Sequence, residues 1–281
     1  MKNYIVLLLL ITISFLSCAD DSFTSSMSEP ICTDSRSFNF NQEGHCHSMG
    51  GCLGYRSGLS NSGDIGLSLN DAYWDQKMIE EVLLQKTFWN GIPAEVFILY
   101  ESSPENANAY ASSNGQIMFG FHMFYQTLQN DGELAIAGIL AHEFGHRAQF
   151  HLDFPFANKR YLELEADAFA GYYMAIAKQY SWNNMSSFFN AMYRAGSSNY
   201  NSLDHHGTPN QRLAAAYFGV QVALEAMRKN TPLSYNDLHN IFTYEIENVI
   251  AFNKSNNSFE EIKYPNITDE ERVALFPFKE L

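Results

Sequence analysis

Two histidines and a glutamate form the pattern His-Glu-x-x-His at residues 142–146. A spacing of four residues places His142 and His146 one turn apart on the same face of a helix, where one cation could bind both imidazoles. Glu143 would then lie beside that cation, in position to act as a general base. The pattern favours a zinc site for hydrolytic chemistry, although two ordinary histidines on a helix would satisfy the same five positions.

A hydrolytic zinc site needs a third protein ligand and an open position for water. The next predicted helix offers three acidic residues, Glu163, Glu165 and Asp167. Glu163 and Asp167 share one helical face, whereas Glu165 points well away from both. We therefore predict Glu163 as the third ligand and Asp167 as the acceptor for the free ring N–H of a ligating histidine. The alternative is a solvated acidic face of the helix.

Hydrophobic periodicity predicts the elements that must position these side chains. The stretch 133–150 is apolar on nearly every side until His142, which indicates a helix buried in the middle of a domain. Residues 94–100 and 116–119 have the pattern of strands in a small sheet. The other predicted helices cover residues 71–88, about 123–128, 161–180, 185–194 and 211–228. We predict a mostly α (α+β) fold with the small sheet beside the helix of the two histidines.

The N-terminus has the pattern of an export signal. Lys2 precedes an apolar run over residues 4–16, and Cys18 follows it. Residues 1–18 are typical of a secretory signal, and the run is too short to span a bilayer comfortably. The cysteine makes this segment resemble the bacterial lipobox; the alternative is an ordinary signal with an incidental cysteine. We expect an exported protein of the bacterial cell envelope, in the periplasm or outer membrane, held in a membrane by a lipid on Cys18.

Composition divides the rest of the chain into a tether and one domain. Residues 19–70 are rich in Ser, Gly, Asn and Asp and lack sustained helical periodicity, which indicates an irregular segment. Residues 71–281 contain the predicted elements. The net charge of -14 makes nucleic acid an unfavourable partner, because phosphates are bound by clustered Lys and Arg.

Three cysteines lie in the predicted tether beyond the lipidation candidate. Cys32, Cys46 and Cys52 can form at most one intrachain disulfide, and the sequence does not choose the pair. A second hypothesis is a pro-segment thiol in the His-Cys-His stretch at 45–47 that blocks the metal. An oxidising compartment favours the disulfide.

Further segments extend the pattern around the two histidines. An Asn-Ala-Tyr-Ala stretch at 108–111 precedes the predicted strand, Glu-Leu stands at 133–134, and Glu-x-x-x-Asp follows at 163–167. Together these motifs resemble the gluzincin metallopeptidases, and in particular the CAAX prenyl protease and HtpX-like family, over about residues 94–218. In that family the stretch at 108–111 leads into an edge strand that runs above the zinc.

The resemblance implies a zincin-like metallopeptidase domain and a zinc-dependent endopeptidase that hydrolyses proteins of the cell envelope. By analogy, Glu163 is its third zinc ligand and Asp167 supports the site. His206 and Arg212 are similar to the family's late histidine with an arginine six residues later, although Gly207 replaces the family's proline. The stretch 204–212 also resembles the secreted neutral zinc metallopeptidases, which share the same chemistry.

These residues predict a mechanism. Zinc would acidify a water molecule, and Glu143 would take its proton and return it to the leaving amine. His206 is the candidate donor to the oxyanion. Arg212 would hold the loop of His206 or pair with Asp167 or another acid. His122, His151 and His239 are assigned no role, because lone histidines are more often hydrogen-bonded structural residues.

The substrate is expected to be a protein or peptide. It could lie extended along Gln116 to Gly120 and add a strand to an exposed sheet edge. The chain has no run of about 20 apolar residues after the signal, so no chamber within the membrane and no prenylated substrate is expected. The alternative function is a zinc-stabilised, chaperone-like or binding lipoprotein without proteolysis, and a surface adhesin ranks last. Glu143 favours the enzyme, because a binding protein needs no general base.

Overall fold

The computed structural model describes residues 64–155, 159–179, 182–195, 206–248, 250 and 262–279, and the structural statements below concern these residues. In chain order its elements are β1 (Asp64–Gly66), α1 (Ala72–Phe88), β2 (Glu95–Tyr100), β3 (Ala109–Ala111), β4 (Gln116–Gly120), α2 (Phe121–Asp131), α3 (Glu133–Leu152), α4 (Lys159–Tyr173), α5 (Trp182–Ala195), α6 (Pro209–Lys229), α7 (Tyr235–Asn248) and α8 (Asp269–Val273). A 3₁₀ turn covers Pro104–Asn106, and a π-helical turn follows α4 over Met174–Lys178.

The mostly helical α+β fold predicted from the sequence is confirmed, and each predicted helix and strand has a counterpart. The predicted helix 161–180 ends its regular part earlier, at Tyr173. Four elements have no predicted counterpart, namely β1, β3, α7 and α8. Since β1 pairs with β2 and lies within the predicted tether, the sheet begins before the predicted boundary at residue 71.

The sheet has four strands in the order β1-β2-β4-β3. The central pair, β2 and β4, is parallel, and the two outer strands are antiparallel to their neighbours. The predicted substrate-binding strand Gln116–Gly120 is therefore wrong, because β4 pairs on both sides and has no open edge. The edge strand beside it is β3, where Tyr110 stands opposite Met118.

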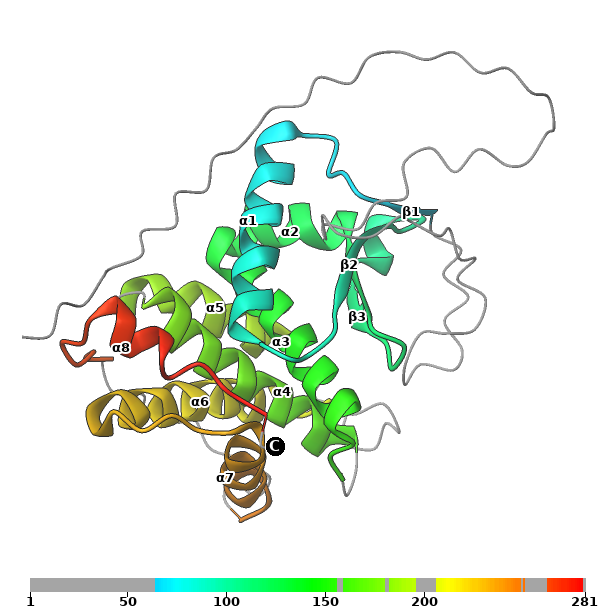
Figure 1. Cartoon of the computed structure of the whole chain (residues 1–281). Helices are drawn as coiled ribbons and strands as arrows, with labels where there is room; N and C mark the ends of the chain where they lie inside the picture. The colour runs from blue at the N-terminus through cyan, green and yellow to red at the C-terminus, as the bar shows by residue number, and fades with distance from the viewer. Residues whose placement is uncertain are drawn as a thin grey trace, which may run out of the picture. The chain divides into compact units, whose positions relative to one another are not determined.

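The helix of the His-Glu-x-x-His pattern, α3, runs through the interior. Its residues are buried without a break from Ala135 to Gln149. It packs against the sheet through β3 and against α2, α4 and α5. Figure 1 shows it between the sheet and the lower helices α6 and α7. Burial on every side agrees with the apolar character that the sequence shows all around this helix.

Helix α4 carries the acidic residues and is held between α3 and α6. A Cβ on Gly145 of α3 would lie 3.1 Å from the Cα of Ala166, so these helices approach closely. On the other side, a Cβ on Gly171 would lie 1.9 Å from the carbonyl oxygen of Ala216, and one on Gly219 would lie 1.9 Å from that of Ala168. This packing leaves Glu163, Glu165 and Asp167 inside the protein, where only paired carboxylates are tolerated.

None of the helices in the described part combines the length and the apolar character needed to cross a bilayer. The predicted signal with Cys18, most of the tether and the cysteines at 32, 46 and 52 lie outside the described residues. Their predicted roles stay predictions.

Candidate metal centre

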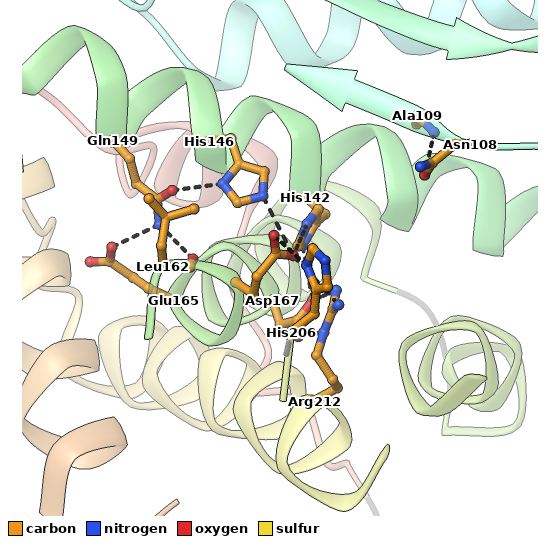
Figure 2. A network of polar contacts seen from close by, with 11 residues as sticks. Asn108, Ala109, His142, His146, Gln149, Leu162, Glu165, Asp167, His206 and Arg212 are labelled. Carbon is orange, nitrogen blue, oxygen red and sulfur yellow. Dashed lines mark hydrogen bonds and ion pairs between the residues drawn. The ribbon is translucent and has the colours of Figure 1, made fainter. Parts of the chain in front are cut away.

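Three potential ligand atoms converge where α3 faces α4. Glu163 Oε2 lies 3.5 Å from His142 Nε2 and 3.8 Å from His146 Nε2. One ligand atom from each of the three residues lies within 4.8 Å of the others. Atoms bound at roughly 2.0 Å to a tetrahedral zinc lie about 3.3 Å from one another. The three predicted ligands therefore fit a zinc ion with little rearrangement. Figure 2 labels the two histidines among them, which both lie on α3.

Glu143 occupies the helix position between the two histidines and lines the same cleft as all three ligands. Its side chain is buried. Burial raises the pKa of Glu143, and positive charge on His142 or His146 opposes this rise. A carboxylate whose pKa is shifted toward neutrality is a stronger base than an exposed one, as general-base catalysis requires.

Glu163 is suited to act as an anionic ligand. Burial alone would raise its pKa, but its contacts with His142, His146 and His206 outweigh this effect and hold the pKa well below the ordinary value. The side chain therefore stays a carboxylate inside the protein. Its second oxygen, Oε1, lies 2.7 Å from His206 Nδ1.

Asp167 lies beneath His142, as the helical spacing predicts. Its Oδ1 is 2.9 Å from His142 Nδ1, although this ring nitrogen makes no well-aligned hydrogen bond. Arg212 Nη2 donates to Asp167 Oδ1 at 2.8 Å, and Arg212 Nε donates to Oδ2. Both side chains are buried. The sequence left open whether Arg212 holds the loop of His206 or pairs with Asp167 or another acid. In the structure it pairs with Asp167. Its Nη1 also lies 3.5 Å from Glu163 Oε2.

The loop of His206 is shaped by its neighbours. Gly207 has φ +95°, a conformation that proline cannot adopt. The glycine in place of the family's proline therefore gives the loop its own backbone path. Thr208 then caps α6, because its side chain accepts from the backbone N–H of Gln211 while Gln211 Oε1 accepts from that of Thr208. This cap holds the half-buried His206 at the cleft.

Three polar residues near the site were not assigned a role from the sequence. His146 Nδ1 lies 2.7 Å from Gln149 Oε1, and Gln149 Nε2 donates to Glu165 Oε2 at 2.8 Å. His239 Nδ1 lies 2.6 Å from Glu165 Oε1. Glu165 does point away from Glu163 and toward these partners, as expected. The i,i+3 spacing of His146 and Gln149 could have indicated the first contact, but nothing local indicates His239.

A cleft of about 410 Å³ opens over the three ligands. Residues 107–111, which include β3, line one part of it, and α2 and α5 line another part through side chains such as Thr127 and Met192. The cleft is lined by both polar and apolar side chains, and Glu143 is among them.

Comparison with known proteins gives a family match for part of this arrangement. Residues 73–158 match the model of peptidase family M48, a stretch that runs from α1 through the His-Glu-x-x-His helix and includes β3. Neither the curated proteins nor the solved structures contain a match to the chain. Glu163, His206 and Arg212 lie beyond the matched residues, and the fold brings them to the matched helix. Over residues 73–158 the chain is thus similar to peptidase family M48, and this match together with the His142, His146 and Glu163 cluster supports a gluzincin metallopeptidase, a hydrolase that acts on peptide bonds.

Proposed function

We propose that the chain is a zinc-dependent endopeptidase of the bacterial cell envelope in which Glu143 activates the attacking water. The observation that carries this proposal is the convergence of His142, His146 and Glu163 with the buried Glu143, all of which line one cleft of about 410 Å³. A zinc ion held there would supply acidity to a water molecule and polarise the scissile carbonyl.

The proton transfers are assigned to Glu143. It takes a proton from water as the new C–O bond forms, and it delivers a proton to the leaving amine as the C–N bond breaks. Its burial supports this role, because a desolvated carboxylate binds a proton more readily than an exposed one. Among the described residues, Glu143 is the carboxylate that directly follows the proposed ligand His142 on α3.

His206 is proposed as a donor to the developing oxyanion. It enters the cleft from the α6 side and contacts the Glu163 oxygen that faces away from the two ligand histidines. A donor near the metal stabilises charge that appears only in the transition state. Arg212 acts more remotely, because it holds Asp167 beneath His142.

The substrate is proposed to lie extended along β3. Ser112 N–H donates to the carbonyl of Gln116, and Gly120 N–H donates to that of Asn108. In an antiparallel pair the alternate residues turn their backbone groups away from the partner strand, so Ala109 and Ala111 turn theirs toward the open edge. Asn108 Oδ1 accepts from the N–H of Ala109 (Figure 2), which leaves Ala111 as the main backbone contact.

The proposed cellular location rests only on the signal-like pattern of residues 1–18. The chain is proposed to be exported and held in a membrane by a lipid on Cys18, with envelope proteins as substrates. Labelling with a radioactive fatty acid in a bacterial host tests the anchor: the wild type should incorporate label, and Cys18→Ala should not. Label retained in Cys18→Ala would overturn the anchor assignment.

Chelation and reconstitution test the metal requirement. A chelator should abolish cleavage of an unfolded protein such as casein, and one equivalent of zinc per chain should restore it. Zinc should also raise the melting temperature of the metal-free protein, because an ion that binds only the folded state stabilises it. Full cleavage by protein shown to be metal-free would overturn the proposal. Zinc binding without any cleavage would favour a zinc-stabilised binding protein.

A further inference from the structure

A buried chain of polar side chains leads from the ligand His146 to α7. It passes from His146 through Gln149 of the same helix and Glu165 of α4, and ends at His239. The links measure 2.7, 2.8 and 2.6 Å. Each of the four side chains is buried. His239 lies well outside residues 73–158, so the segment that matches the family model does not contain all four of these polar residues.

The orientation of the Gln149 amide indicates which tautomer of His146 fits this contact. Gln149 Nε2 lies 2.9 Å from the carbonyl oxygen of Leu162, which can only accept a hydrogen bond. The atom facing Leu162 must therefore be the amide nitrogen, and the atom facing His146 must be the oxygen. Because that oxygen can only accept, His146 carries its proton on Nδ1 and keeps the lone pair of Nε2 for a cation.

Glu165 and His239 hold the amide in this orientation. Glu165 Oε2 takes the second N–H of Gln149, and Glu165 Oε1 contacts His239 Nδ1. The His239 ring stacks on Phe154, with centroids 4.0 Å apart and planes at 16°. Phe154 lies just beyond the end of α3, so this stacking ties the ring to the end of the helix that bears both ligand histidines.

The two ligand histidines are supported by different parts of the fold. Asp167 and Arg212 lie beneath His142, with the arginine on α6. The polar side chains that support His146 end instead at His239 on α7. Figure 2 shows three of these residues, His146, Gln149 and Glu165. Two independent supports would let each imidazole be oriented separately.

We propose that Gln149, Glu165 and His239 are positioning residues that set the tautomer and orientation of His146, so that α7 takes part in metal binding. The inference rests on the proposed role of His146 as a zinc ligand. Its test uses zinc affinity, so it is decided whether or not the wild type cleaves protein.

The experiment measures zinc affinity of the full mature chain by competition with a chromophoric chelator, together with the absorption spectrum of the cobalt(II) form. His239→Leu removes the polar contact, whereas His239→Asn keeps an amide that can match either hydrogen-bonding role near the position of Nδ1. His151→Leu, a change of an exposed histidine on α3, is the control. Melting temperatures of the metal-free forms report folding separately.

We expect His239→Leu to weaken zinc binding about tenfold, the lower end of the range for residues that support a ligand. Gln149→Leu should cost more, on the order of 10–100-fold, and should change the cobalt spectrum. Glu165→Gln should weaken binding in the same direction, while His239→Asn and His151→Leu should stay near wild type. Wild-type affinity and spectrum in His239→Leu and Glu165→Gln would overturn the proposal. Equal loss in His239→Asn and His239→Leu would overturn it too, because packing alone would then explain the effect.

Discussion

Arg147 donates from Nη1 to the carbonyl oxygen of Ser112 at 2.5 Å and thereby joins the helix of the metal ligands to the end of the edge strand. Its Nε also donates to the carbonyl oxygen of Pro93 at 3.0 Å, just before β2. Since Arg147 directly follows His146, one residue step separates a proposed zinc ligand from the anchor of β3. This relationship fixes the position of the proposed substrate-binding edge relative to the metal centre.

Replacing Arg147 with methionine should weaken substrate binding and leave zinc content unchanged. The buried carbonyl oxygen of Ser112 would lose its donor at a cost of about 1–3 kcal/mol, and the carbonyl oxygen of Pro93, at an exposed residue, would lose its contact too. We expect kcat/KM for an extended peptide to fall at least about tenfold, which corresponds to about 1.4 kcal/mol. Steady-state kinetics and metal analysis check this. The kcat/KM of Arg147→Lys should fall between those of the wild type and Arg147→Met. An unchanged kcat/KM in Arg147→Met would show that Arg147 does not position β3.

Glu101 anchors the start of the edge strand to α2. Its carboxylate accepts from the backbone N–H groups of His122 at 2.9 Å and of Met123 and Asn108 at 3.3 Å. Glu101→Gln replaces an acceptor oxygen with a donor, so it should lower the free energy of unfolding by about 1.5–3 kcal/mol, as loss of charged hydrogen bonds does. Urea denaturation measures this. The exposed Glu105→Gln is the matched control, and equal stability of both variants would contradict the anchoring role.

The pair of Arg212 and Asp167 predicts a large effect of a single substitution. Arg212→Met leaves the Asp167 carboxylate buried without its main partner, which costs about 3–5 kcal/mol of stability. Arg212→Lys keeps the charge but loses the two-pronged contact, so it should lie between wild type and Arg212→Met. Arg228→Met, at an exposed position of the same helix, should change stability by less than about 0.5 kcal/mol. Thermal unfolding that ranks Arg212→Met with Arg228→Met would refute this interpretation.

The close packing of α4 on α6 predicts that Gly219→Ala destabilises the fold. The added Cβ would meet the carbonyl oxygen of Ala168 at 1.9 Å, and backbone on both sides must then move. Such overpacking costs about 1–3 kcal/mol. Chemical denaturation compared with Gln221→Ala, at a partly exposed position on α6, measures the cost. A Gly219→Ala protein as stable as the control would mean that α4 and α6 are not in this close contact.

Much of the candidate site could be predicted from sequence because its geometry is local to two helices. The spacing of His142 and His146, and that of Glu163 and Asp167, determines which side chains share a face. The structure accordingly brings the two histidines and Glu163 together and places Asp167 beneath His142. A buried helix also has a plain signature, since its apolar residues cover every side.

The parts of the site and of the sheet that the sequence did not predict depend on contacts between distant segments. His239 reaches Glu165 only because α7 packs on α4, and no spacing along the chain encodes that contact. The sequence predicts Gln116–Gly120 as the substrate-binding edge, whereas this strand is paired on both sides. The hydrophobic pattern of a segment indicates that it is a strand, but not which strands flank it, so it does not identify the short strand β3 as the edge.

The most direct test of the proposed function compares the wild-type chain with Glu143→Gln for zinc content and for cleavage of casein. The substitution keeps the size of the side chain and all three proposed ligands but removes the proposed general base. We predict one zinc per chain in both proteins and cleavage by the wild type alone, with kcat lowered by at least about 100-fold in the variant. Cleavage by a zinc-loaded Glu143→Gln protein at the wild-type rate would contradict the assignment of Glu143, and the absence of zinc from both proteins would contradict the metal centre itself.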